Sequence, residues 1–395
     1  MAPQRELHGL NWLFFFVADL QAGFGPFVAV YLTTHSWTQA ELGLALGVGS
    51  ASAMLAQVPA GVLVDALRSK AMAAAAALIG VGASAMLMAW SPALWPVLLA
   101  QSIQGLASCM LNPALAALTL GLVSGAAVAE RLGRNARFAA IGSAVGAVLM
   151  GVCGTWVSTQ AVFWLAALMC VPALIALQSL GKATLVSAPA KVAGPVHEAV
   201  RGVLLDRRLL AYVACTMLFT LANAAMLPLA GVEITKRADE KASLIIAACI
   251  LVPQFLVALL SPLAGRAAEQ WGRRGVLLVG FCALPARAVL LAVVNDPMWI
   301  IPVQALDGLG GAVFGVMTPL VAADVSGPCG RFNLRMGILG LAIGVAATVS
   351  NTVAGAIASN LGAQTAFIAL GLVGISAVLT VGLAMPETRP RVVVV

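Results

Sequence analysis

The chain consists of long apolar runs separated by short polar breaks, and this pattern decides its fold class. Apolar residues make up 61% of the 395 positions and charged residues only 9%, whereas soluble domains carry about 25% charged residues. Most runs reach the roughly 20 residues that a helix needs to cross a bilayer. A soluble domain is therefore excluded, and so is an outer-membrane barrel, because its strands would alternate in polarity. We expect an all-α integral membrane protein.

The breaks divide the chain into six spans, one long polar connector and six more spans. We therefore predict an N-terminal six-helix bundle over residues 1–180, a cytoplasmic linker over 181–208 and a C-terminal six-helix bundle over 209–395. The second part of the linker is either an amphipathic helix on the membrane surface or a solvated connector. The predicted spans cover residues 10–32, 41–63, 71–90, 95–120, 137–158, 160–180, 209–231, 242–264, 275–294, 298–322, 336–358 and 363–384.

The distribution of basic residues predicts the orientation of the chain. A net charge of +7 could suggest nucleic-acid binding, but the positions of the charges indicate topology instead, and we expect no nucleic-acid partner. With residue 1 in the cytoplasm, only Lys236, Arg237 and Lys241 of the 22 Lys and Arg residues fall in outward segments, and Arg287 falls within a span. Cytoplasmic loops of membrane proteins are enriched in Lys and Arg. We therefore expect a multi-pass protein of the cell inner membrane with both termini in the cytoplasm.

The two halves of the chain resemble each other at a nearly fixed offset, which indicates an internal repeat. The loops after spans two and eight each place an acid four positions after a glycine, and Gly61 and Gly265 are separated by 204 positions. These loops contain Gly61, Asp65 and Arg68 in the first copy, and Gly265, Glu269, Gly272, Arg273 and Arg274 in the second. Two further sets match: Gln101 and Gly105 with Gln304 and Gly308, and Asn135, Arg137, Gly142 and Gly146 with Asn333, Arg335, Gly340 and Gly344.

Each repeated loop has a physical interpretation as a gate. Glycine allows two helices to approach closely. The acid can cap the N-terminus of a helix in the adjacent bundle or pair with an Arg there, and such a latch must break when the bundles rock apart. The alternative is a charged turn that only marks topology.

These motifs resemble a known family. Gly-x-Leu-x-Asp followed by basic residues, repeated in the second half, is similar to the signature loop of the major facilitator superfamily, and the tail from Pro386 to Arg389 is like the one that ends many members. The resemblance implies two pseudo-symmetric bundles that alternately open a central cavity lined by spans one, four, seven and ten. Its drug–proton antiporters often have an Arg where this chain has Gln101, and Arg68 replaces the usual second glycine. The subgroup therefore stays open.

Two charged residues lie deep in neighbouring spans. Counted from the outward turn near Asp296, Arg287 and Asp307 both lie roughly 13–17 Å into the membrane, so they could pair. One interpretation is a structural ion pair between spans nine and ten. The other places Asp307 on the cavity together with Gln304, one turn earlier on the same face, where Asp307 contacts substrate or proton and Arg287 tunes its protonation.

Asp19 is the third charge inside a span, and it has no evident cationic partner. Burial penalises a charged carboxylate, which makes Asp19 the leading candidate proton carrier. Its counterpart in span seven is Asn223, so both halves keep a polar group at one depth. The alternative is an Asp satisfied by neighbouring backbone or hydroxyl groups. The remaining candidates for the substrate cavity are Gln21, Gln101 and Asn351.

The expected function is proton-coupled efflux of a small organic solute by alternating access, through a monomer in the lipid bilayer. An uptake permease or uniporter for an organic anion, with Arg287 as charge partner, is the main alternative, and a non-transporting receptor is a remote one. We expect no enzyme, because His8, His35 and His197 all lie outside the spans. Neither a cofactor nor a metal site is predicted.

Overall fold

The computed structural model describes residues 4–22, 24, 26–67, 69–125, 127–180, 202, 205–238, 242–326 and 331–389. Throughout these residues the regular structure is helical, with no strand. Twelve helical segments are long and apolar enough to cross a membrane. The predicted fold class is therefore confirmed. Most of the predicted linker, 181–208, lies outside the described residues, and so does Arg68.

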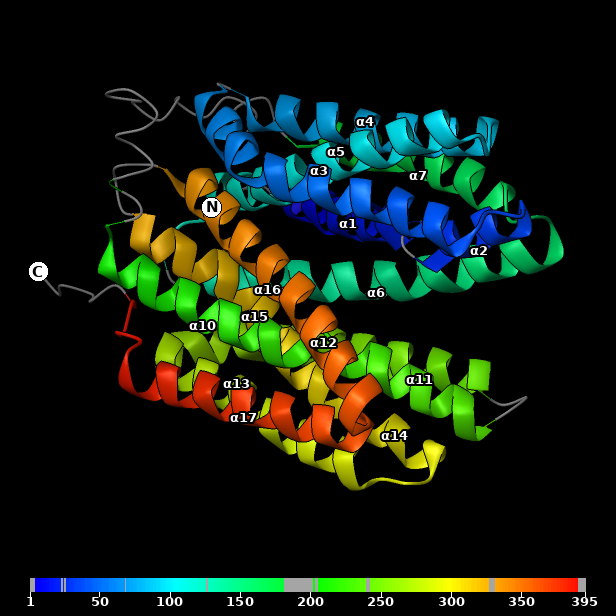
Figure 1. Ribbon diagram of the computed structural model, residues 1–395. Helices are drawn as coiled ribbons and strands as arrows, with labels where there is room; N and C mark the ends of the chain where they lie inside the picture. The colour runs from blue at the N-terminus through cyan, green and yellow to red at the C-terminus, as the bar shows by residue number, and fades with distance from the viewer. Residues whose placement is uncertain are drawn as a thin grey trace, which may run out of the picture. The chain divides into compact units, whose positions relative to one another are not determined.

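The chain folds into two compact units (Figure 1). The first unit comprises Met1–Val196 and Pro328–Leu341, and the second His197–Gly327 and Ala342–Val395. The two units thus share one helix, α16. The boundaries of the two predicted bundles stay a prediction, because a compact unit is not shown to be a moving body.

Among the described residues, the first unit contains α1 to α7 and the start of α16, and Figure 1 shows α3, α4 and α5 lying side by side. Helix α1 contacts α6 and α7, and α3 and α4 both contact α5. The helices are α1 (Gln4–Ala22), α2 (Pro26–Thr34), α3 (Gln39–Ala66), α4 (Lys70–Trp90), α5 (Leu94–Leu122), α6 (Ala127–Trp156) and α7 (Ala161–Gln178).

The second unit is built in a similar way around α13, which contacts α15 and α17, while α12 contacts α15. The helices are α10 (Arg207–Asn223), α11 (Met226–Ala238), α12 (Ala242–Trp271), α13 (Arg273–Val293), α14 (Pro297–Val303), α15 (Ala305–Ser326), α16 (Phe332–Leu361) and α17 (Ala363–Leu383). Only the part of α16 from Ala342 onward belongs to this unit.

Several helices begin at residues that cap their free N–H groups. Thr38 and Glu41 form a capping box at the start of α3, with the Thr38 N–H donating to Glu41 Oε2 at 2.9 Å. Asp206 accepts from the N–H of Arg208 at 3.0 Å at the start of α10. Asp296 caps α14 in the same way. The start of each of these helices is therefore stabilised by residues next to it in the sequence.

Four boundaries differ from the predicted spans by six residues or more. The first span begins at Gln4 and not at 10, the fifth begins at Ala127 and not at 137, the seventh reaches Arg237 and not only 231, and the eighth reaches Trp271 and not only 264. The charged residues in these stretches suggested loops. At the ends of membrane helices, however, long basic side chains can reach the interface while their backbone stays helical.

Three spans consist of two helices each: α1 with α2, α10 with α11, and α14 with α15. Hydropathy does not change across these breaks, so the apolar pattern locates the spans but does not reveal their interruptions. Figure 1 shows α11 continuing in the direction of α10 beyond its break. A break inside a membrane helix exposes backbone groups that another part of the protein must satisfy.

Ser350 of α16 satisfies the break between α10 and α11. Its hydroxyl accepts from the N–H of Ala225 at 3.2 Å and donates to the carbonyl of Leu221 at 2.8 Å. Ser350 is only 1% exposed, so no solvent can replace it. One buried hydroxyl thereby stabilises the interruption of the seventh span.

Glycines on α6 allow a close approach to α1. A Cβ at Gly142 would collide with the carbonyl oxygen of Phe15, and a Cβ at Gly146 would collide with the carboxylate of Asp19 and lie 2.9 Å from its Cα. The repeated glycine Gly340 is likewise in contact with the side chain of Gln57. These repeated glycines therefore act as helix-packing positions, as small residues do in membrane interfaces.

We predict that Ser350→Ala destabilises the protein by about 1–2 kcal/mol, because it leaves the buried N–H of Ala225 without its partner and removes the donor to the part-buried carbonyl of Leu221. Unfolding in detergent micelles measures this change. Ser376→Ala is the matched control, since the hydroxyl of Ser376 donates only to the carbonyl of Val373 in its own helix. Equal losses in both variants would contradict a bridging role for Ser350.

Candidate functional site

A buried guanidinium organises the polar centre of the second unit. Arg287 of α13 is 1% exposed. Its Nη1 donates to Asn223 Oδ1 and Asp307 Oδ1, and its Nη2 donates to Gln304 Oε1, each at 2.6 Å. The structure thus brings together four of the five cavity residues that the sequence assigns to this unit, and only Asn351 lies elsewhere.

Helix breaks position the three acceptors. Asn223 is the last residue of α10, directly before the break to α11. Gln304 lies between α14 and α15, and Asp307 belongs to the first turn of α15. Interrupted helices therefore aim side chains at Arg287 that an uninterrupted apolar helix would not present, as at the midplane sites of transporters.

The hydrogen-bonding capacity of this cluster is not filled. The Nε of Arg287 and the Nε2 of Gln304 are buried and have no hydrogen-bond partner among the described residues. The thiol of Cys249 on α12 lies beside both side chains, but a thiol is a weak acceptor. Two donors thus remain available for an acceptor that is not part of the described chain.

Apolar residues pack on one side of the cluster. Leu291 lies one turn beyond Arg287 on α13 and packs in one group with Ala288, Ile300, Phe367 and Cys249. Low-polarity surroundings strengthen the attraction between Arg287 and Asp307 and penalise either charge alone. Separating Arg287 from Asp307 is therefore costly unless another group pairs with the charge that is left.

Asp19 in the first unit has a different environment. Its side chain is 2% exposed, and its Oδ1 has no hydrogen-bond partner among the described residues. The backbone of α6 at Gly146 packs directly against it. No ion pair within the described part of the chain involves Asp19, unlike Asp307.

The other three predicted cavity residues lie in different places. Gln21 is half-buried, and its Nε2 is buried without a partner in the described chain. Gln101 is buried against Gly49 at the contact of α5 with α3. Asn351 is exposed and donates to the carbonyl of Ala347 in its own helix. The structure does not join these three to the Arg287 cluster.

The first repeated loop ends in a helix cap. Asp65 Oδ1 accepts from the backbone N–H of Asn333 at 3.1 Å and from its side-chain Nδ2 at 2.7 Å, while Oδ2 accepts from the N–H of Leu334 at 2.9 Å. A Cβ at Gly61 would collide with the backbone of Asn333. Gly61 and Asp65 thus serve the same contact, with the N-terminus of α16 in the first unit. A carboxylate is favoured there by the helix dipole.

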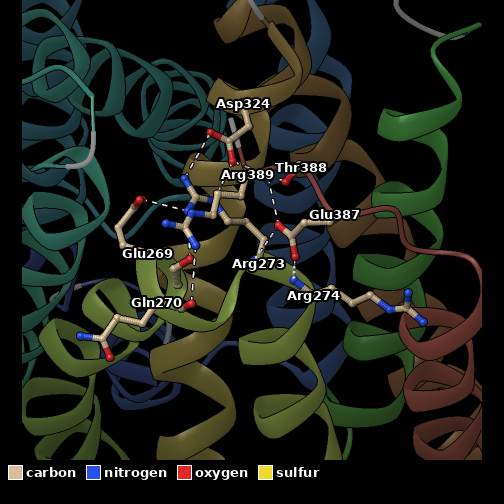
Figure 2. A network of polar contacts seen from close by, with 9 residues as sticks. Glu269, Gln270, Arg273, Arg274, Asp324, Glu387, Thr388 and Arg389 are labelled. Atoms are coloured by element: carbon tan, nitrogen blue, oxygen red, sulfur yellow. Dashed lines mark hydrogen bonds and ion pairs between the residues drawn. The ribbon is translucent and has the colours of Figure 1, made fainter. Parts of the chain in front are cut away.

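The second repeated loop builds a different network (Figure 2). The side chain of Arg273 pairs with Glu269 at 2.9 Å and with Asp324 at 2.8 Å. Glu387, from the tail after the last span, accepts from the N–H of Arg273 at 2.9 Å and from that of Arg274 at 3.2 Å. Here the tail caps α13, and the acid of the loop pairs with Arg273.

Gly272 is required beside this cap. Its φ is +83°, a conformation that side-chain-bearing residues rarely adopt. A Cβ at this position would also collide with the carboxylate of Glu387.

The remaining predicted gating residues differ in exposure. Gly265 is buried in α12, while Arg137 is exposed and Arg335 half-buried.

Sequence reasoning missed three polar residues of these networks. Asp324 and Glu387 were not assigned contacts, and neither was Lys70, whose Nζ donates to the carbonyls of Val64, Asp65 and Leu67 at the end of α3. The Pro-Glu-Thr-Arg tail was a usable signal for Glu387. Asp324 carried a signal too, because it is an acid near the end of an apolar span.

The pKa of Glu387 is lowered from its ordinary value of 4.5. Burial of the carboxylate raises this pKa, but the N–H donors of Arg273, Arg389 and Arg274 and the charge of Arg273 lower it more. The bonded state of Glu387 is therefore the ionised one.

Comparison with known proteins gives consistent results. The family model described as Major Facilitator Superfamily matches residues 10–252 and 214–394. The uncharacterised MFS-type transporter Rv2456c of Mycobacterium tuberculosis and its counterpart MT2531 from a second strain are each 34% identical to this chain over 404 residues, covering 98% of it and 94% of their own length. The crystal structure of the human organic anion transporter MFSD10 superposes with a TM-score of 0.79 at 16% identity, covering 96% of this chain and all of that one. This last likeness shows the fold alone.

We predict that the stability contributed by Glu387 depends on pH. Because its folded pKa is lowered, the contribution is complete above the ordinary pKa and is lost as pH falls through the lowered value. Unfolding of the wild type and of Glu387→Gln should therefore differ at neutral pH and converge in acid. A difference that is independent of pH would mean that packing, and not charge, makes Glu387 stabilising.

Proposed function

This chain belongs to the major facilitator superfamily, and from that premise we propose that it couples the movement of a small organic solute to a proton gradient, with Asp19 as the proton-carrying group. The family resemblance drawn from the repeated loops is confirmed. The protein is accordingly a multi-pass membrane transporter and not an enzyme. The coupling ion, the direction and the roles of individual residues are our proposals.

The observation that carries the proposal is the lack of partners around Asp19. An ionised carboxylate without partners is costly inside a membrane protein, and a proton removes that charge. Asp307 is paired with Arg287 at 2.6 Å, whereas Asp19 Oδ1 has no partner among the described residues. Of the two acids within spans that sequence reasoning selected, Asp19 is thus the better candidate proton carrier.

The contact with α6 supports a link between protonation and helix packing. Asp19 lies on the bare backbone of Gly146, so no α6 side chain stands between the two helices. If Asp19 loses its proton, its charge must reach water or a cation, and the close contact has to change. Gain and loss of a proton would thereby bias two arrangements of α1 and α6, as a switch between alternating states requires.

We further propose export, by a monomer in the cell inner membrane with both termini in the cytoplasm. The orientation is supported by the scarcity of Lys and Arg in outward segments. Export is supported by the apolar character of spans one, four, seven and ten, which suits amphiphilic solutes arriving from inside the cell. The capped contacts of Asp65 and Glu387 would lie on the cytoplasmic side and act as gating contacts.

A second candidate function is uptake or uniport of an organic anion. The observation in its favour is Arg287, a buried cation with an unused donor. Uniport needs no proton carrier, so this candidate predicts that Asp19 is dispensable.

We predict that Asp19→Asn abolishes transport driven by a pH gradient, because an amide cannot exchange a proton. A panel of labelled solutes, offered to proteoliposomes with and without an imposed pH gradient, first identifies a transported compound and then measures the variant. Exchange of that compound without a gradient should persist. Wild-type rates of gradient-driven transport in Asp19→Asn would rule out this role.

A matched pair of glycine variants serves as the control. Gly146→Ala introduces a methyl group against Asp19, while Gly142→Ala, one turn away, introduces it against the backbone of Phe15. Both should disturb the packing of α1 on α6 to a similar degree. Only Gly146→Ala should change the pH dependence of transport, and identical pH profiles would speak against coupling through this contact.

The orientation gives a separate prediction. Green fluorescent protein fused to the C-terminus should fluoresce, because it stays in the cytoplasm, and alkaline phosphatase at the same place should be inactive. Phosphatase inserted after residue 240, in the segment with Lys236, Arg237 and Lys241, should be active. The opposite result at either position would reject the proposed topology.

A further inference from the structure

A single carboxylate, that of Asp307, balances the positive charge of Arg287. Among the described residues, the titratable or charged side chains at this cluster are Arg287, Asp307 and the Cys249 thiol. Asn223 and Gln304 are neutral amides. The carboxylate of Asp307 therefore supplies the negative charge that keeps a fully buried guanidinium in place.

The geometry of the ion pair leaves part of the guanidinium unused. Asp307 binds Nη1 through Oδ1 alone, and it shares that nitrogen with Asn223. Guanidinium and carboxylate commonly bind through two parallel hydrogen bonds. Here the Nε of Arg287 donates to no described acceptor. An anion with two oxygens could use more of the guanidinium than Asp307 does.

Burial differs sharply between the two partners. The side chain of Arg287 is 1% exposed, whereas that of Asp307 is 21% exposed. Asp307, together with the half-buried Asn223, therefore forms the accessible edge of the cluster, and apolar packing covers the side towards Leu291. A solute that reaches Arg287 approaches past these two side chains.

We propose that the Arg287 cluster is the binding site for the anionic group of an organic anion, and that Asp307 is a tethered substitute for that group. The arriving carboxylate replaces Asp307 on Arg287, and the amide nitrogen of Gln304 and the Nε of Arg287 supply further donors. The displaced side chain of Asp307 turns to its exposed side. Arg287 is then paired with an anion whether or not substrate is bound.

This inference deepens the proposed function, because it names the substrate class of the same transporter. It also explains how a cluster with no net charge, in which Asp307 balances Arg287, can bind the negative group of a substrate. Asp307 and substrate compete for one cation, so the apparent affinity for an anion is the intrinsic affinity reduced by the fraction of sites that Asp307 leaves open. Removing the competitor should tighten binding, although it removes a polar contact.

The test is ligand binding to the purified full chain in lipid nanodiscs, measured by calorimetry and by the shift in unfolding temperature. The probes are acetate, benzoate and 2-naphthoate, each against its neutral amide, with benzylamine as the cationic control. Wild type should bind at least one carboxylate, and bind it more tightly than its amide and than benzylamine. The same carboxylate should inhibit solute transport in proteoliposomes.

Three variants define the site. Asp307→Asn should bind the carboxylate about tenfold more tightly than wild type, if about a tenth of wild-type sites are open at rest. Arg287→Gln should not bind it. Each single variant leaves one buried charge without a partner and could fail to fold. The double variant Arg287→Gln with Asp307→Asn removes both charges and avoids that problem. It should not bind the carboxylate. Arg237→Gln, which removes a cation paired with Glu233 at the outward end of α11, should bind like wild type.

Two outcomes would overturn the inference. If carboxylates bind Asp307→Asn but never wild type, the pair is structural and the added anion merely fills a gap. If no probe binds any variant more tightly than its amide, or if binding survives in the double variant, Arg287 is not an anion site.

Binding and transport together separate the anion site from the proton role of Asp19. Asp19 lies in the other unit, so Asp19→Asn should bind the carboxylate that wild type binds, and with the same affinity. Intact anion binding together with a dispensable Asp19 would reject the proton role and leave the anion site standing. A required Asp19, together with carboxylate binding that is unchanged in Arg287→Gln, would reject the anion site and leave the proton role standing.

Discussion

The interior of a bilayer offers no water to hydrogen-bond, so each polar group within a span must find its partner in the chain. This constraint explains the polar contacts described above. Arg287 collects three oxygen acceptors from two interrupted helices, and Ser350 completes the backbone at one of those interruptions. Asp19 is one of several exceptions, since its Oδ1, like Arg287 Nε and Gln304 Nε2, has no partner among the described residues. Asp19 differs from Arg287 in that no ion pair among those residues involves it, and this isolation of a carboxylate is what our proposal for it uses.

The two halves repeat their sequence more closely than their contacts. In the first copy the acid of the loop, Asp65, caps a helix. In the second copy the equivalent acid, Glu269, pairs with Arg273, and the cap comes from Glu387 outside the repeat. The capped helices differ as well, since Asp65 caps the start of α16 and Glu387 caps the start of α13. A cap needs only a negative group at the right place, which leaves its origin free to change.

The sequence predicted the spans well, because hydropathy reports directly on transfer into a bilayer. Depth counting also brought Arg287 and Asp307 to one level, since a helix rises by a constant amount per residue. The breaks beside Asn223 and Gln304 could not be predicted, because apolar composition continues across them. No local pattern in the sequence predicts which distant residues meet in the folded chain. The contacts of Ser350 with Leu221 and of Glu387 with Arg273 are examples. Gln101 shows the converse: its polarity suggested a cavity, whereas it packs against Gly49.

Helix α16 begins in one unit and ends in the other, with the division between Leu341 and Ala342. Asp65 caps the start of α16 in the first unit, while the residues of α16 from Ala342 onward belong to the second. Gly337 and Gly340 pack on Gln57 shortly before that division. A side chain added at either glycine would therefore disturb the stretch of helix through which the chain passes from one unit to the other.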